Sequence, residues 1–199
     1  MAKQKILLHS CCAPCSTAVI ERLADDYEIT ILYYNPNIYP EEEYLKRKNE
    51  EIKYIELLNK TKPEISVKLM DCDYEPEIFY EATKGLEDER EGGARCSVCF
   101  ALRLDKTAKL AKDNGFDVFG TTLTVSPHKN SEVINNIGNN LSEKYKIKYL
   151  ESNFKKQNGY KRSIELSKEN NLYRQNYCGC EFGLKFQLKE APESLKKVY

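Results

Sequence analysis

Short apolar runs alternate with longer segments whose apolar residues recur at helical spacing. Runs of strand length lie at residues 5–9, 28–34, 66–70, 117–123 and 147–150. Helices are expected at residues 13–24, 41–59, 76–85, 96–114, 131–144, 159–170 and 186–198, the second of them charged and on the surface. Strands that alternate with helices predict an α/β fold with a mostly parallel, Rossmann-like sheet and flanking helices.

Length and composition favour one folded domain over residues 1–199, with a helical C-terminal part at about 151–199. At 41% hydrophobic and 31% charged residues, the chain is neither disordered nor embedded in a membrane. No apolar run approaches the roughly 20 residues that cross a bilayer, and the apolar stretch near the N-terminus is too short for a signal peptide. We therefore expect a cytoplasmic protein without a membrane partner.

The net charge of zero hides an asymmetry between the two ends of the chain. Residues 143–199 contain 13 Lys and Arg against 7 Asp and Glu, whereas residues 1–142 contain 18 against 24. A basic C-terminal third is suited to a polyanion such as RNA. Solvated helix faces of an ordinary enzyme would give the same pattern, so charge alone leaves both interpretations open.

The eight cysteines are the most informative feature of the sequence. Seven of them are clustered, and only Cys72 stands alone, as expected for a packed thiol. The three clusters are Cys11, Cys12 and Cys15; Cys96 and Cys99; and Cys178 and Cys180. Because structural disulfides are rare in a reducing compartment, clustered cysteines indicate metal binding or redox chemistry.

Two of the clusters together could form a site of four thiolates. Cys11 and Cys12 follow the first strand at a helix N-terminus, where the helix dipole favours thiolate, and Cys96 and Cys99 share one side of a first helical turn. Four thiolates hold either tetrahedral zinc or an iron–sulfur cluster. The adjacent Cys-Cys pair favours a [4Fe–4S] cluster, while zinc, or no metal, remains open.

The third cluster, Cys178-Gly-Cys180, predicts redox chemistry. A disulfide between residues two apart requires a tightly bent chain and should be readily reduced. Two packed core thiols, or further metal ligands together with Cys15, are the alternatives. For His9, beside the first cluster, a hydrogen-bonded core histidine is the simpler interpretation, and a role in orienting a ligand is the alternative. No Walker-type loop or GxGxxG is present, so the sequence gives no support for ATP or dinucleotide binding.

Four segments in the same order resemble the epoxyqueuosine reductase QueH family. They read HSCCAPC, GLEDEREGGARCSVCFALRL, TTLTVSPHKN and NFKKQNGYKRSIELSKENNLYRQNYCGCEFG, and they span residues 9–183. The resemblance implies an α/β sheet like that of the adenine nucleotide α-hydrolases, with the nucleotide loop replaced by a cysteine turn after strand one. It implies the last step of queuosine synthesis, in which the epoxide of a tRNA wobble base is reduced to an alkene with release of water.

The resemblance also implies a cofactor and a set of site residues. The implied ligands of a [4Fe–4S] cluster are Cys11, Cys12, Cys96 and Cys99, and the implied redox pair is Cys178 and Cys180. Charge and position in the chain, rather than the resemblance, make Lys129, Lys155, Lys156 and Arg174 the candidate substrate-binding residues. The expected partner is a tRNA with a queuosine-type wobble base, and the sequence does not identify the external electron donor.

A second, mononuclear metal, iron or zinc, is also expected, with Cys15 and an acidic residue as candidate ligands. One departure bears on it: members often carry an acid where this chain has Asn153 before Phe-Lys-Lys. If that acid were a ligand, this second site would be in doubt here. Two other functions stay open, namely a non-catalytic zinc-binding, RNA-binding module and a general thiol oxidoreductase.

Overall fold

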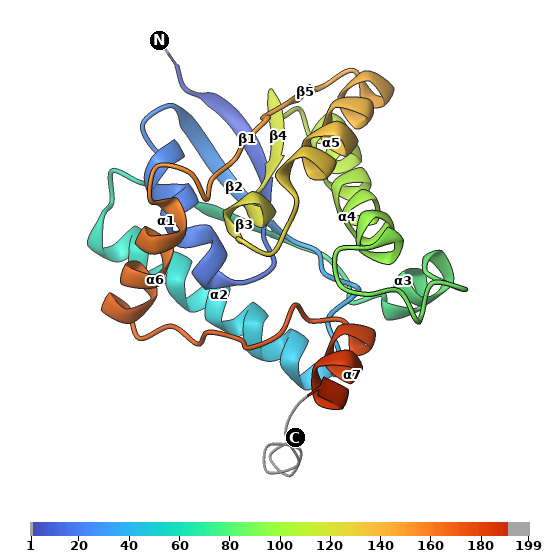
Figure 1. Cartoon of the computed structure of the whole chain (residues 1–199). Coiled ribbons are helices and arrows are strands. Elements are labelled where there is room, and N and C mark those ends of the chain that lie inside the picture. The colour runs from blue at the N-terminus through green and yellow to red at the C-terminus, as the bar shows by residue number, and fades with distance from the viewer. Residues whose placement is uncertain (1, 191–199) are drawn as a thin grey trace.

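The computed structural model of this protein describes residues 2–190. Within that range, five strands form one all-parallel sheet in the order β3–β2–β1–β4–β5 (Figure 1). The strands are β1 (Gln4–His9), β2 (Tyr27–Tyr33), β3 (Lys68–Asp71), β4 (Val118–Thr121) and β5 (Lys148–Tyr149). The predicted α/β fold with a parallel sheet is confirmed.

Helices connect successive strands and cover both faces of the sheet (Figure 1). They are α1 (Ala13–Leu23), α2 (Glu41–Thr61), α3 (Pro76–Ala82), α4 (Ala94–Asp113), α5 (Ser131–Tyr145), α6 (Gly159–Glu169) and α7 (Glu181–Glu190), with a short 3₁₀ helix η1 (Thr122–Val125). Within the described range, none of these helices is both long and apolar enough to span a bilayer.

The alternation of side chains along β1 divides the core into two layers. Ile6 and Leu8 pack on one face of the sheet in a cluster that includes α1 and α2, whereas Leu7 packs on the other face against Leu104 of α4. All of these side chains are fully buried. A central strand that is apolar on both faces is typical of a parallel sheet covered by helices.

Most predicted elements differ by a few residues from their bounds in the structure, and two of these differences have a clear local cause. The strand expected at residues 117–123 ends at Thr121, because the Thr121 hydroxyl accepts a bond from the Leu123 amide and starts η1. The last helix begins at Glu181 rather than at 186, since Cys180 and Phe182 pack in the cluster of Phe79. Its predicted end at 198 lies outside the described residues.

The second helix is not the purely surface helix that its charge predicts. Arg47 and Glu51 are 1% and 0% exposed, and with Glu43 they form a polar stripe at four-residue spacing along α2. The following turns of α2 pack against the sheet through the buried side chains of Tyr54, Ile55 and Leu58. The stripe faces the end of the sheet where the cysteines gather. The charged groups of Arg47 and Glu51 therefore bind polar groups of the protein instead of solvent.

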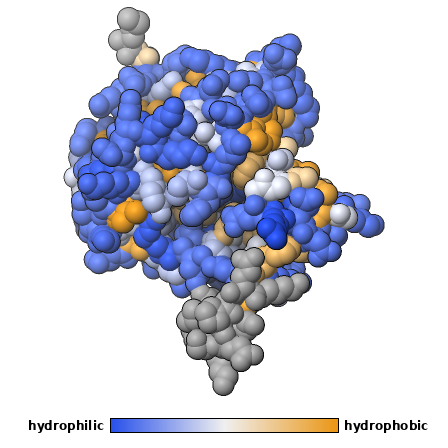
Figure 2. Space-filling model, in the orientation of Figure 1, coloured by the Kyte–Doolittle hydropathy of each residue, from blue (hydrophilic) through white to orange (hydrophobic). Residues whose placement is uncertain are grey.

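The strand order places a natural binding position at the carboxyl end of β1. The chain leaves β1 toward β2 on one side, and β4 lies on its other side. In open α/β sheets, ligands bind outside the carboxyl ends of strands at such a switch point. Most of the face seen in Figure 2 is hydrophilic, with apolar side chains confined to small patches.

Candidate metal and thiol site

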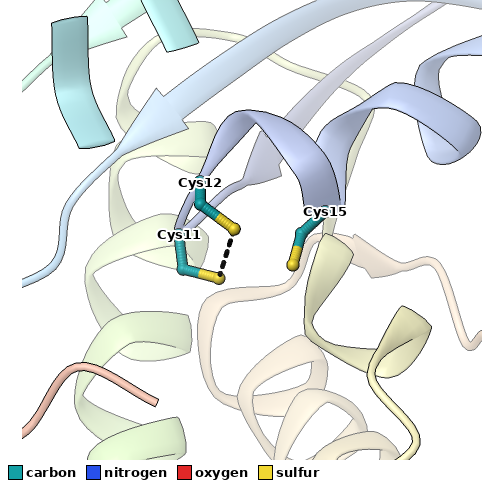
Figure 3. A group of neighbouring side chains, drawn as sticks. All are labelled: Cys11, Cys12 and Cys15. Carbon is teal, nitrogen blue, oxygen red and sulfur yellow. Dashed lines mark hydrogen bonds between the residues drawn. The ribbon is translucent and has the colours of Figure 1, made fainter. Parts of the chain in front are cut away.

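A turn of three residues carries two cysteines from β1 into α1. β1 ends at His9, Cys12 is the N-cap residue, and Pro14 occupies the first turn of α1, where its missing N–H leaves no bond unmade. The sulfur atoms of Cys11 and Cys12 are 3.8 Å apart. Those of Cys11, Cys12 and Cys15 all lie within 4.8 Å of one another and point toward a common centre (Figure 3).

A buried carboxylate holds both ends of this cysteine turn. The hydroxyl of Ser10 donates to Glu51 over 3.0 Å, and that of Ser16 donates to the other oxygen of Glu51 over 2.6 Å. Asn35 donates to the Ser10 carbonyl over 2.8 Å. Burial raises the pKa of Glu51 to about 7. The thiols are thus displayed on a segment whose backbone is tied to α2.

His9 lies beneath the turn and is fully buried. Its ring nitrogens lie 3.1 Å from the Thr121 hydroxyl and 3.2 Å from the Tyr34 carbonyl, and both are hydrogen-bonding distances. Burial, together with the positive charge of Arg103, lowers the pKa of His9 to about 3. His9 is therefore a neutral, fully hydrogen-bonded core residue, as its sequence position suggested.

The other four clustered cysteines come from α4 and from the segment before α7. Cys96 and Cys99 lie in the first two turns of α4, and the Gly92 amide donates to the Cys96 sulfur over 3.2 Å. Cys180 packs with Cys99 and Phe79, and its sulfur accepts from the Gly183 amide over 3.2 Å. All eight cysteines are free thiols.

The Cys178–Cys180 segment is anchored by α2. The Arg47 guanidinium donates to the carbonyl oxygens of Cys178 and Tyr177 over 3.2 and 3.4 Å, and it forms an ion pair with Glu43 at 2.6 Å. Gly179 has a φ of +127°, and a Cβ there would lie 3.1 Å from Arg47. The bent backbone of this segment therefore requires glycine between the two cysteines.

The thiols differ in their affinity for protons. Hydrogen bonds from Cys12 and Cys15 lower the pKa of Cys11 well below its usual value, whereas the Cys11 bond raises that of Cys12 to about 12. Burial raises the pKa of Cys99 to about 12. The thiolate charge of Cys11 is thus stabilised by hydrogen bonds from two neighbouring thiols. A metal ion would stabilise such an arrangement, because metal ligation requires thiolate.

A cavity of about 640 Å³ opens beside these sulfurs. Its volume suits a ligand of nucleoside size. It is lined by Cys11, Cys15, Lys129, Tyr160, Arg174 and Cys178, among others. A smaller adjoining cavity shares Lys129 and Cys178 and is also lined by Cys96. At least one cysteine of each sequence cluster therefore lines one of these two adjoining cavities.

Three of the four predicted cluster ligands lie in or against one layer of the core. Cys11 and Cys12 pack in the α4–α5 core layer, and Cys96 packs against the same layer. Among the described residues, however, only Cys15 joins Cys11 and Cys12 in a set close enough to share one metal ion. Asn153, the position that bears on the expected second metal, has a buried side-chain oxygen without a hydrogen-bond partner.

The four basic residues expected to bind substrate differ in whether they line the larger cavity. Lys129 and Arg174 line the larger cavity, whereas Lys155 and Lys156 do not. The Lys155 amino group donates to the Lys129 carbonyl over 2.8 Å, so it supports the loop that carries Lys129. Lys156 is exposed. Burial alone would lower the pKa of Lys129, but the charges of Cys178 and Cys11 raise it.

Several site residues escaped sequence reasoning. Glu51 and Arg47 are among them, and their four-residue spacing on α2 is the one signal that could have pointed to a buried face. Arg103 is another: it follows Cys96 and Cys99 by seven and four residues, which places all three on one side of α4. Gln175 donates to the Cys12 sulfur over 3.0 Å, and no sequence pattern announces that contact.

Comparison with known proteins identifies close relatives. The family described as Epoxyqueuosine reductase QueH matches residues 6–186. The chain is 46% identical over 185 residues to the protein named Epoxyqueuosine reductase QueH of Streptococcus pyogenes serotype M1, covering 93% of this chain and 72% of the relative. It is 47% identical to the protein of that name from Staphylococcus epidermidis (90% and 76% covered) and 39% identical to that of Thermotoga maritima (90% of each).

Proposed function

This chain belongs to the epoxyqueuosine reductase QueH family, and from that premise we propose that it reduces epoxyqueuosine to queuosine at the wobble position of a tRNA. The observation that carries the proposal is the gathering of cysteines from three distant segments around a nucleoside-sized cavity and the smaller cavity that adjoins it. The reaction takes two electrons and two protons, opens the epoxide to an alkene and releases water. We expect it in the cytoplasm, where tRNA is modified.

The residues around the cysteines fit an anionic cluster. Arg95 and Arg103 are 1% and 2% exposed, and each has a buried guanidinium nitrogen without a hydrogen-bond partner. Within residues 2–190, neither forms an ion pair with a carboxylate. Buried cations without a counter-charge are strongly unfavourable, and a thiolate-bound iron–sulfur cluster supplies negative charge there.

The proposed ligands of the [4Fe–4S] cluster are Cys11, Cys12, Cys96 and Cys99. When bound, the cluster would relay single electrons or polarise the epoxide oxygen as a Lewis acid. Cys15 then remains for a mononuclear metal, iron or zinc, as the third sulfur of the close set. Glu51 and the two serines that it binds keep the turn in the shape that presents these sulfurs.

Cys178 and Cys180 are proposed as the redox pair. Closing two thiols to a disulfide releases two electrons and two protons, which is what removal of the epoxide oxygen as water requires. Cys178 lines both cavities, and Cys180 lies behind it, packed against Cys99. Arg47 and Gly179 hold the bend of the backbone between Cys178 and Cys180, and this bend keeps the two thiols available to form a disulfide. An external donor must then reduce the disulfide.

The proposed substrate reaches the cavity as a single nucleotide. A cavity of about 640 Å³ admits one nucleoside but no duplex, so the wobble base must leave the stack of the anticodon loop. Tyr160 offers an aromatic face for it, and Lys129 and Arg174 offer positive charge for phosphate. Lys155 and Lys156 lie outside the lining and would contact the tRNA backbone beyond the flipped nucleotide.

The decisive experiment is anaerobic purification followed by iron, sulfide and zinc analysis and a turnover assay on epoxyqueuosine tRNA. We expect a brown protein with iron and sulfide that converts the substrate. The Cys178→Ser and Cys180→Ser variants should keep the iron and lose conversion, while Cys72→Ser, at the end of β3 outside the site, serves as the matched control.

Two results would contradict the proposal. A colourless protein with stoichiometric zinc and no conversion would indicate a zinc-binding, RNA-binding module. Native conversion by the Cys178→Ser/Cys180→Ser double variant would remove the redox pair from the mechanism, and reduction of protein disulfides without action on tRNA would indicate a general thiol oxidoreductase. Binding of tRNA should weaken steeply as salt rises, because phosphate contacts release counterions.

A further inference from the structure

Three arginines are fully buried in the part of the chain that the structure describes, and they differ in what balances their charge. Arg47 has a carboxylate partner in Glu43 at 2.6 Å. Arg95 donates to the carbonyl oxygens of Leu86 and Glu87 over 3.1 and 2.8 Å, and so closes the loop before α4. Arg103 has neither a carboxylate nor a loop to close among the described residues, so its burial calls for another explanation.

The contacts of Arg103 leave most of its guanidinium unused. Its Nε donates to the Cys99 carbonyl over 3.1 Å, which is a bond within α4, and its Nη2 is buried without a partner. The guanidinium lies 5.7 Å from the centre of the Phe100 ring, a contact that offsets only part of the desolvation of a charge. A cation retained in such a position indicates that an anion belongs beside it.

Arg103 follows Cys96 and Cys99 by seven and four residues on one side of α4, and the groups that act on its charge include these thiols, those of Cys11 and Cys178, and the cation of Lys129. Burial works to lower the pKa of Arg103, and the negative charge of Cys99, Cys11, Cys178 and Cys96 raises it. The charge of Arg103 in turn favours the thiolate form of Cys11 and Cys99, although burial still raises the pKa of Cys99 to about 12. Arg103 is thus a cation that influences both the cysteine turn after β1 and the cysteines of α4, the two segments proposed to hold the cluster.

We propose that Arg103 is a positioning residue that balances the negative charge of the bound cluster and thereby raises its reduction potential. The inference rests on the proposed function, because it assumes that the cysteines hold an iron–sulfur cluster. Reduction adds one electron to a cluster that is already anionic. A fixed buried cation stabilises the reduced form more than the oxidised form, since the interior screens charge weakly. Arg103 touches no substrate in this role.

The test measures the midpoint potential of the cluster in the anaerobic holoprotein by reductive titration followed with electron paramagnetic resonance. Arg103→Gln removes the charge and keeps a polar side chain, whereas Arg103→Lys keeps the charge and loses the planar fork. Lys109→Met removes an exposed cation from the same helix and serves as the control. Iron, sulfide and circular dichroism establish that each protein is folded and loaded.

We expect Arg103→Gln to lower the equilibrium constant for cluster reduction at least tenfold, which is about 59 mV for a one-electron couple. Arg103→Lys and Lys109→Met should stay close to the wild type. A loaded Arg103→Gln protein with the wild-type potential overturns the proposal. If Arg103→Gln folds but does not load, loading of Arg103→Lys supports it, and failure of both variants overturns it.

The outcome for the wild type separates this inference from the proposed function. A wild-type protein without iron and sulfide refutes the cluster, and the role of Arg103 falls with it. A wild-type protein that holds the cluster and converts the substrate, beside an Arg103→Gln protein of unchanged potential, refutes only the role of Arg103.

Discussion

Replacing Glu51 with glutamine should change the stability of the protein by an amount that depends on pH. Glu51 is completely buried, and burial raises its pKa from the usual 4.5 to about 7. Glutamine has the same shape and no charge, and its amide can accept from one serine hydroxyl and donate to the other. The substitution therefore removes the charge while the bonds to Ser10 and Ser16 can persist.

The sign follows from the raised pKa. Between pH 4.5 and 7, folded Glu51 binds a proton more tightly than unfolded Glu51, so the stability that it contributes falls as pH rises through this window. The interval between 4.5 and about 7 corresponds to roughly 3 kcal/mol at about 1.36 kcal/mol per pH unit. Above pH 7 the folded state carries the whole of this penalty, and at pH 5 it carries little.

The assay is urea denaturation of the metal-free, reduced protein at pH 5 and pH 8, followed by circular dichroism. Glu51→Gln should increase the free energy of unfolding by up to about 3 kcal/mol at pH 8 and by less than about 1 kcal/mol at pH 5. Glu56→Gln, on an exposed position of the same helix, is the control and should change it by no more than about 0.5 kcal/mol at either pH.

An equal effect of Glu51→Gln at both pH values would refute the reasoning, because it would mean that the charge of Glu51 does not change in this range. Lower stability of the variant at pH 8 would refute it as well. That result would show that the carboxylate binds the two serine hydroxyls strongly enough to exceed its own desolvation.

Two further predictions concern glycines. Gly138→Ala should lower the free energy of unfolding by about 1–3 kcal/mol in urea denaturation, because its Cβ would lie 2.3 Å from the Tyr149 ring, and an unchanged midpoint would contradict that packing. Gly179→Ala should reduce turnover of epoxyqueuosine tRNA at unchanged iron content, since φ is +127° and the new Cβ would crowd Arg47 and Ile38. Native turnover of this variant would show that the bend at Gly179 does not position the two thiols.

Arg47 and Glu51 show how one helix can organise two distant cysteine segments. They lie one turn apart on the buried face of α2, and Glu51 binds the serines that bracket the cysteine turn. Arg47 binds the backbone of Tyr177 and Cys178, more than a hundred residues away in sequence. The separation between the turn and the proposed redox pair is thus determined by the pitch of a helix.

Local features of the sequence were sufficient to predict the frame. The run at residues 5–9, the helix that Pro14 opens and the cysteines between them all appear as expected, because strand length, apolar spacing and the first-turn preference of proline are properties of neighbouring residues. The parallel sheet followed from the alternation of strands with helices. The cysteine clusters were visible as spacing, and they indicated both metal and redox chemistry.

The sequence by itself determined the order of strands and helices and the chemical types at the site. Only the tertiary structure decided that α7 starts directly after Cys180 and that α2 buries a charged stripe. It also decided that Arg103 lies near thiols and, within residues 2–190, forms no ion pair with a carboxylate. The physical reason is range: spacing within a turn is set by bonded geometry, whereas the environment of a buried charge depends on segments that packing alone brings together.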